Sequence, residues 1–371
     1  MITPEFLENL DYSKLVMIYS QLNIDITASI IKRILELKKI DTFTKSQIRT
    51  LIETNGIEIF EMALKKTTLL NSKIKDELKK TYENMAKNNM ESYKQLYEYT
   101  GNTFKISKAQ LQILNGAIKQ GGKELINLSK TIAFSSQQLY VEALDRAYFQ
   151  VVTGGRDYIS VIEDTVRDLA KKGVTLEYKN KKGKTINVQL ETAVRRNLLT
   201  GIKQTADNIT KEIEEEIGCN GYEVVAHTGA RPSHAKAQGK QYAKTKADAK
   251  KYHVGYWGDV KHLWEEPNCR HTYFGIILGI SEPVYTKKEL KKLEKKEVTY
   301  QGKKIKEYEA TQIQRKLERE QRVLQRTIIP LKKSKQNIDD LELRLKQKQT
   351  EYKRFCRETG LTPQYERTKV M

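Results

Sequence analysis

The sequence is poor in the residues that cross-link small secreted domains and in those that interrupt helices. Of its 371 residues, only 3 are cysteine, 6 are proline and 20 are glycine. Three cysteines without a Cys-x-x-Cys pair exclude a disulfide-framework fold and favour a reducing compartment. The low proline and glycine contents exclude collagen-like and proline-rich architectures.

The chain also lacks long apolar runs. Its first residues show no basic start followed by an apolar stretch, and nowhere do about 18 apolar residues follow one another. We therefore expect neither a signal peptide nor a membrane span. Hydrophobic residues make up 38% of the chain and charged residues 31%, which is typical of long solvated helices rather than of disorder.

Positive charge is the clearest excess. Lysine and arginine number 67 against 47 acidic residues, and the formal net charge of +20 predicts anionic partners. Residues 281–371 hold over half of this excess, with 25 Lys and Arg against 14 Asp and Glu. Such a segment is either a solvated helical surface or a contact for DNA or an acidic partner, and both interpretations stay open here.

Hydrophobic periodicity predicts an α+β protein with a mainly helical N-terminal half. Residues 1–150 repeat apolar positions at intervals of three and four and form a predicted helical domain, with a break between helices at 119–123. Residues 151–217 predict a connector in which a helix is followed by a β-hairpin at 174–189 and by a second helix at 191–217.

Two further units are predicted after the connector. Residues 218–285 form a small α+β unit that contains histidine, cysteine and tryptophan, here called the histidine module. Residues 286–371 form a basic helical tail, in which Thr286 and Glu289 make a capping box and 298–305 make a small hairpin.

Pro330 is predicted to stop a helix within this tail, because proline lacks the N–H group that a helix interior needs. Beyond it, Leu331, Ile338, Leu345 and Tyr352 repeat every seven residues. Polar residues interrupt the matching positions, so we expect a weak seam packed on this chain or on a neighbour rather than a free coiled coil.

The histidines are concentrated in the histidine module. All five lie between His227 and His271, and Trp257, Trp264 and Cys269 lie there too. The pattern predicts a strand over 222–227, a short helix, and then an extended segment from Cys269 in which Cys269 and His271 share one face. Any specialised function of the chain is expected here.

The short helix of the histidine module is bracketed by two residues with known positional preferences. Pro232 begins it and Gly239 follows its end, which is the usual asymmetry of helix termini.

A set of motif residues follows in a fixed order through this module: His227, Gly229, Arg231, Pro232, Ser233, His234, Gln238, Gly239, Lys240, Asn268, Cys269, Arg270 and His271. Their order resembles the phage minor capsid protein 2 family, the second of the minor head proteins encoded near the portal in tailed phages and prophages. It is also similar to the C-terminal module of the Mu F-like minor head proteins. Residues 24–34 and 193–201 resemble the family as well.

The resemblance implies a structural protein of the virion, located in the phage head and, during assembly, in the cytoplasm of the host bacterium. It implies the portal and other head proteins as partners, several copies per assembly, and no cofactor. The basic tail adds an expected sequence-nonspecific contact with DNA, which salt would weaken.

A metal site is one alternative for the histidine module, because histidine and cysteine are zinc ligands. The spacings from His227 to His234 and from Cys269 to His271 match neither a zinc finger nor a His-Glu-x-x-His helix, so we expect no metal. Cys269 acting as a nucleophile with a histidine partner is a further alternative, but no pattern in the sequence indicates an activated thiol.

Catalysis on a phosphodiester or nucleotide is the remaining alternative. In that interpretation the protein is a nuclease-like enzyme that acts as an ejected effector, with His234 and His271 as acid and base. Arg231 or Arg270 would hold phosphate and Lys240 would assist. We favour a non-enzymatic role, in which the histidines are hydrogen-bonded members of a small core.

Overall fold

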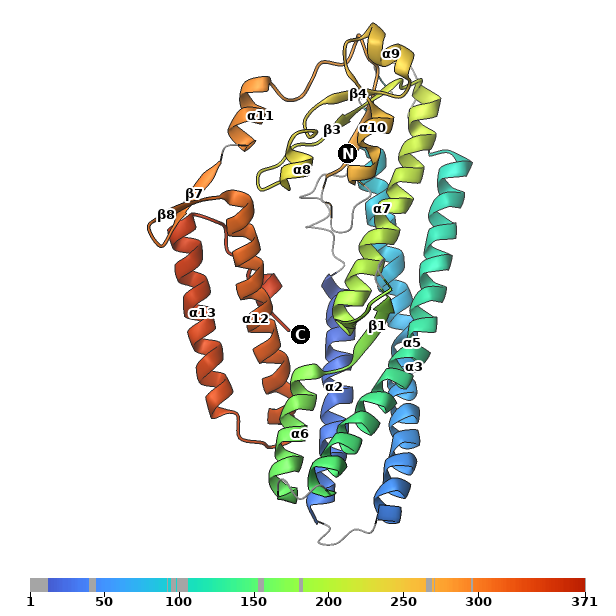
Figure 1. Ribbon diagram of the computed structural model, residues 1–371. Helices are drawn as coiled ribbons and strands as arrows, with labels where there is room; N and C mark the ends of the chain where they lie inside the picture. The colour runs from blue at the N-terminus through green and yellow to red at the C-terminus, as the bar shows by residue number, and fades with distance from the viewer. Residues whose placement is uncertain are drawn as a thin grey trace.

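The computed structural model describes residues 13–39, 45–91, 93–94, 98, 106–152, 157–179, 183–264, 269, 271–294 and 296–370. The protein is 73% helical with small sheets, which confirms the predicted helix-rich α+β class. Figure 1 shows an elongated molecule in which long helices run side by side, the histidine module lies at one end, and a helical hairpin lies along one flank.

Five helices form the elongated body. They are α2 (Ser13–Glu36, continued by the short 3-10 helix η1, Leu37–Lys39), α3 (Lys45–Glu91), α5 (Lys108–Val152), α6 (Tyr158–Lys172) and α7 (Leu190–Ile217). Their apolar faces meet in one core, and Ile26, Ile30 and Ile34 of α2 are completely buried in it. In the described ranges no helix is long and apolar enough to cross a bilayer.

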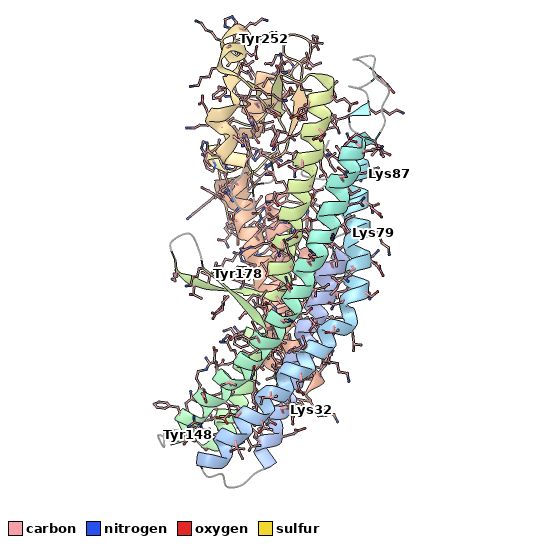
Figure 2. All side chains as sticks on the ribbon, turned by 90° about the vertical axis from the view of Figure 1, so that its right-hand side faces the viewer. Lys32, Lys79, Lys87, Tyr148, Tyr178 and Tyr252 are labelled. Atoms are coloured by element: carbon pink, nitrogen blue, oxygen red, sulfur yellow. The ribbon has the colours of Figure 1, made fainter. Side chains whose placement is uncertain are left out.

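The break predicted at 119–123 is wrong, because α5 continues through both glycines. Gly121 faces α3, and a Cβ atom there would lie 3.2 Å from the Leu78 side chain. The missing side chain lets the two longest helices approach closely, so packing over their whole length offsets the poor helix propensity of glycine. Figure 2 shows α3 and α5 together, with Lys79 and Lys87 along their outer edge.

The connector follows the prediction closely. Helix α6 begins after Asp157, whose carboxylate accepts a hydrogen bond from the Ser160 N–H at 2.9 Å. Strands β1 (Thr175–Lys179) and β2 (Thr185–Gln189) pair antiparallel, which confirms the hairpin. Tyr178 lies on this hairpin, which projects to one side of the long helices in Figure 2.

A four-stranded sheet organises the histidine module. Its strands are β3 (Gly221–Val224), β4 (Gln241–Ala243), β5 (Gly255–Tyr256) and β6 (Tyr273–Ile276), in the order β5-β4-β3-β6. Strand β3 is antiparallel to β4 and β6, whereas β4 and β5 are parallel. Three short helices surround the sheet: α8 (Pro232–Ala235), α9 (Lys246–Lys251) and α10 (Trp257–Trp264).

The C-terminal region contains a capped helix, a hairpin and two longer helices. They are α11 (Lys287–Glu294), β7 (Glu297–Tyr300), β8 (Lys303–Lys306), α12 (Glu307–Lys333) and α13 (Asp339–Thr359), followed by the 3-10 helix η2 (Tyr365–Thr368). The capping box is confirmed, since the Thr286 N–H donates to Glu289 at 2.8 Å and the Glu289 N–H donates to Thr286 Oγ1 at 3.2 Å. The hairpin is confirmed as β7 and β8.

The predicted helix stop at Pro330 is wrong, because α12 continues to Lys333. Ile328 and Leu331, on either side of this proline, are buried in the core of the helical body. This packing holds the last turn in spite of the missing N–H group. Helix α13 folds back on α12, so Tyr352 of the heptad stripe lies in a core within this chain.

Candidate functional site

A closed loop after β3 positions the motif residues of the histidine module. The Gly239 N–H donates to the Val224 carbonyl at 2.8 Å, and the Val224 N–H donates to the Lys240 carbonyl at 3.1 Å. Gly239 has a φ of 66°, and a Cβ atom there would lie 2.2 Å from Leu290 of α11. Only glycine satisfies both the backbone conformation and this close approach.

Helix α8 lies within that loop and carries His234. Pro232 is its first residue and Arg231 precedes it with extended backbone angles, as the sequence predicts. The His234 and Ala235 N–H groups both donate to the Arg231 carbonyl, at 2.9 and 2.8 Å. This turn directs His234 into the module core, where its side chain is buried, while Ser233 on the same turn is exposed.

The segment that precedes β6 places the side chains of Cys269 and His271 next to His234. The Val225 N–H donates to the Thr272 carbonyl at 2.9 Å and extends the β3–β6 pairing to Thr272, the residue after His271. The His271 Nδ1 atom then lies 3.4 Å from His234 Nδ1, and Cys269 Sγ lies 3.6 Å from each of these atoms. We call these three residues the His–Cys cluster.

Gln238 sets the orientation of His271. Its Oε1 atom lies 2.9 Å from His271 Nε2 and accepts the His227 N–H at 3.1 Å. A carboxamide oxygen can only accept, so His271 carries its proton on Nε2 and presents the Nδ1 lone pair to the cluster. His227 stacks on this ring, with centroids 4.3 Å apart.

The surroundings keep His271 neutral. Burial lowers the pKa of His271 to about 2, and the nearby charges of His227, His234, Lys203 and Arg231 act in the same direction. A histidine that stays neutral at physiological pH cannot supply a proton as a general acid.

Two residues that the sequence did not single out as site residues complete these surroundings. The Trp264 ring lies 5.5 Å from that of His234 and 5.1 Å from that of His271, measured between centroids. Lys203 of α7 donates to the Trp264 carbonyl at 2.5 Å and ties the module to the helical body. The clustering of tryptophan with histidine is a signal for Trp264, but no local pattern identifies Lys203.

Comparison with known protein families identifies the family of this chain. The family model described as phage minor capsid protein 2 matches residues 2–357, which span both the helical body and the histidine module. The chain belongs to the phage minor capsid protein 2 family. No curated protein and no solved structure matches it.

Membership confirms the resemblance read from the sequence and implies a structural role in the phage head for this minor capsid protein. Other head proteins are the partners that such a role implies.

The candidate catalytic residues of this minor capsid protein are only partly brought together. His234 and His271 are in contact, and the positive charge of Arg231 acts on His271. Lys240 is exposed and directly precedes β4. Asn268 and Arg270 lie outside the described residues.

Proposed function

We propose that this minor capsid protein is a structural, portal-associated component of the head of a tailed phage or prophage. In this role it helps to assemble the head and contacts packaged DNA. The observation that carries the proposal is the family match over residues 2–357, because the matched range contains nearly all of the described helices and strands. The lowered pKa of His271 and its burial support a non-enzymatic role for the histidine module.

A surface of unpaired lysines supports the DNA contact. We call it the basic patch, and it consists of Lys287, Lys288, Lys291, Lys292, Lys303, Lys304 and Lys306. These side chains are exposed on α11 and β8, and none of them forms an ion pair within the described part of the chain. Figure 1 shows α11 and the β7–β8 hairpin at one edge of the molecule, on the side away from α3 and α5.

The basic patch has the character of a phosphate-binding surface without base readout. Residues 286–306 hold 9 lysines and 3 glutamates, so their local charge is strongly positive. Lysine neutralises backbone phosphate and releases condensed counterions, and this contribution is independent of DNA sequence. A surface of this kind suits a protein that contacts packaged DNA of any sequence.

Portal association is tested by co-expression with the portal protein encoded by the same phage genome. We expect the two chains to elute together in size-exclusion chromatography at the size of the portal ring, and mass spectrometry of purified heads to detect the minor capsid protein. An intact portal ring that elutes without this chain, together with heads that lack it, would contradict the proposal.

The DNA contact is tested by measuring affinity for duplex DNA over a salt series. The variant with Lys303→Gln, Lys304→Gln and Lys306→Gln removes three charges from the patch. We expect weaker binding and a slope of log affinity against log salt that is less negative by about 1 for each lysine that contacts a phosphate.

A matched control removes the same charge from another surface. Lys65, Lys73 and Lys75 are exposed on α3, and their replacement by glutamine should leave the salt slope unchanged. Equal effects of the two triple variants would show that net charge alone, rather than the basic patch, attracts DNA. Deletion of residues 286–371 is a poor test, because Ile328 and Leu331 of α12 belong to the core of the helical body.

A further inference from the structure

The three donor atoms of the His–Cys cluster form a nearly equilateral triangle. His234 Nδ1 and His271 Nδ1 are 3.4 Å apart, and Cys269 Sγ is 3.6 Å from both. Zinc in proteins binds nitrogen at about 2.0–2.1 Å and sulfur at about 2.3 Å with tetrahedral angles, which places two nitrogen ligands about 3.3–3.4 Å apart and a nitrogen and a sulfur about 3.6 Å apart. The triangle therefore has the dimensions of one face of a tetrahedral zinc site.

The hydrogen bonds around the cluster also suit a metal. Gln238 Oε1 accepts the Nε2 proton of His271 at 2.9 Å, so the nitrogen that faces the cluster is the one with a lone pair. An outer partner that fixes the tautomer and the ring orientation is a regular feature of histidine ligands in metal sites. Gln238 is itself held by the His227 N–H, which limits its movement.

The cluster is shielded from solvent on the side of the two histidines and is accessible on the side of Cys269. His234 and His271 are buried, and Trp264 packs against both rings. Cys269 is only half-buried and gives an ion a route into the site. Cys219 and Cys356, the remaining cysteines, are buried elsewhere in the chain, so Cys269 alone can contribute a thiolate here.

We propose that His234 Nδ1, His271 Nδ1 and Cys269 Sγ bind one Zn²⁺ ion. On binding, the thiol releases its proton to solvent and a Zn–S bond forms, while the two imidazoles bind as neutral ligands without a change in proton number. Two nitrogens and one thiolate in tetrahedral arrangement favour Zn²⁺ over the hard cations Mg²⁺ and Ca²⁺, which prefer oxygen.

The ion would act as a cross-link within the histidine module. His234 lies on α8 and Cys269 lies 35 residues later, and β4, α9, β5 and α10 all lie between them in the sequence. A bond between these segments closes a long loop and stabilises the module that carries the family motif. This inference concerns metal binding and does not depend on portal association or DNA contact.

The sequence alone predicts no metal, because the separations of these residues along the chain differ from those of zinc fingers, in which ligands from one short segment surround the ion. Here the pairing of β3 with β6 brings together ligands that are distant in sequence.

The test uses the full-length protein, first stripped of metal with a chelator and then titrated with Zn²⁺ or Co²⁺. We expect one equivalent to bind and the melting temperature to rise with added Zn²⁺. The Co²⁺ form should show a thiolate-to-metal charge-transfer band in the near ultraviolet, together with the intense visible bands of tetrahedral cobalt. Stripped wild-type protein that binds neither ion, or a cobalt spectrum without the thiolate band, would overturn the proposal.

Variants identify the ligands. His234→Ala, Cys269→Ser and His271→Ala should each weaken Zn²⁺ binding by at least a hundredfold. His262→Ala is the matched control, because His262 is exposed on α10 in the same module, and it should bind like the wild type. Equal losses in the control and the ligand variants would contradict the assignment.

A chemical probe separates metal binding from thiol catalysis and works on the wild-type protein, even if the variants fold poorly. Iodoacetamide should alkylate Cys269 in the stripped protein, and Zn²⁺ should slow that reaction at least tenfold. Unchanged alkylation in saturating Zn²⁺ would show that Cys269 is not a ligand and would overturn the proposal.

Discussion

Glu214 provides the sharpest test of how the histidine module packs against the helical body, because it is buried between the two. This glutamate lies on α7 with 1% of its surface exposed, and Lys244 Nζ is 3.3 Å from its carboxylate. Gly275 of β6 lies directly against it, since a Cβ atom there would be 2.5 Å from Glu214 Cγ. Burial raises the pKa of Glu214 from 4.5 to about 7, although Lys244 acts in the opposite direction.

The sign of the effect on stability follows from this raised pKa. The folded protein holds the Glu214 proton more tightly than the unfolded chain does, so the contribution of this group is fully present below pH 4.5. It is lost as the pH rises through about 7. One pKa unit corresponds to about 1.4 kcal/mol, so the complete loss is about 3 kcal/mol. That is a large part of the stability of an ordinary domain, about 5–15 kcal/mol.

The perturbation is Glu214→Gln, which keeps the shape of the side chain and removes its titration. We expect the variant to gain about 2–3 kcal/mol in unfolding free energy relative to the wild type between pH 5 and pH 8. Urea denaturation followed by tryptophan fluorescence measures this in the relevant region, because Trp257 and Trp264 are both buried in the histidine module. The matched control is Glu215→Gln, since Glu215 is exposed one residue further along α7.

A difference between Glu214→Gln and wild type that stays constant from pH 5 to pH 8 would refute the reasoning. So would an equal pH dependence of the gain in Glu215→Gln. The first result would mean that Glu214 is ionised in the folded protein and that Lys244 outweighs the cost of burial. The second would mean that the pH dependence does not come from the burial of Glu214.

Three further predictions concern packing and are checked by chemical denaturation. Gly116→Ala should stabilise the protein by about 0.5–1 kcal/mol, because this position of α5 has open space around it; a loss would reveal a contact there. Gly239→Ala should cost about 1–3 kcal/mol more than Gly302→Ala, since both positions have positive φ but only Gly239 lies against Leu290; equal costs would exclude overpacking. Arg326→Met should cost about 3–5 kcal/mol because it leaves the partly buried Glu191 of α7 without its ion-pair partner at 3.4 Å, and adding Glu191→Gln should recover most of that loss. A double variant as unstable as the single one would contradict this account.

The secondary structure was predictable wherever neighbouring residues decide it. The capping box at Thr286 and Glu289 and the β1–β2 hairpin depend on contacts within a few residues, and both are confirmed. The errors lie where distant packing outweighs local preference. Gly121 sits inside a helix because α3 packs against it, and Pro330 sits inside another because the residues around it are buried.

The candidate site divides in the same way. The sequence identified the motif residues and placed Cys269 and His271 on one face, and their contact at 3.6 Å agrees with that. The division of the chain into four regions stays a prediction. The basic surface was recognised from composition, but its concentration on α11 and β8 depends on which lysines the fold leaves exposed and unpaired.

By itself, the sequence determined the family, the helix-rich class, the short turns and the excess of positive charge, because these depend on residue identity and on spacing along the chain. Only the tertiary structure decided that His234, Cys269 and His271 meet, since their approach depends on the register between β3 and β6 and on the loop that Gly239 closes. It also decided that Glu214 is buried beneath β6. Burial and the approach of distant segments set ligand geometry and pKa values, and neither is encoded by local spacing.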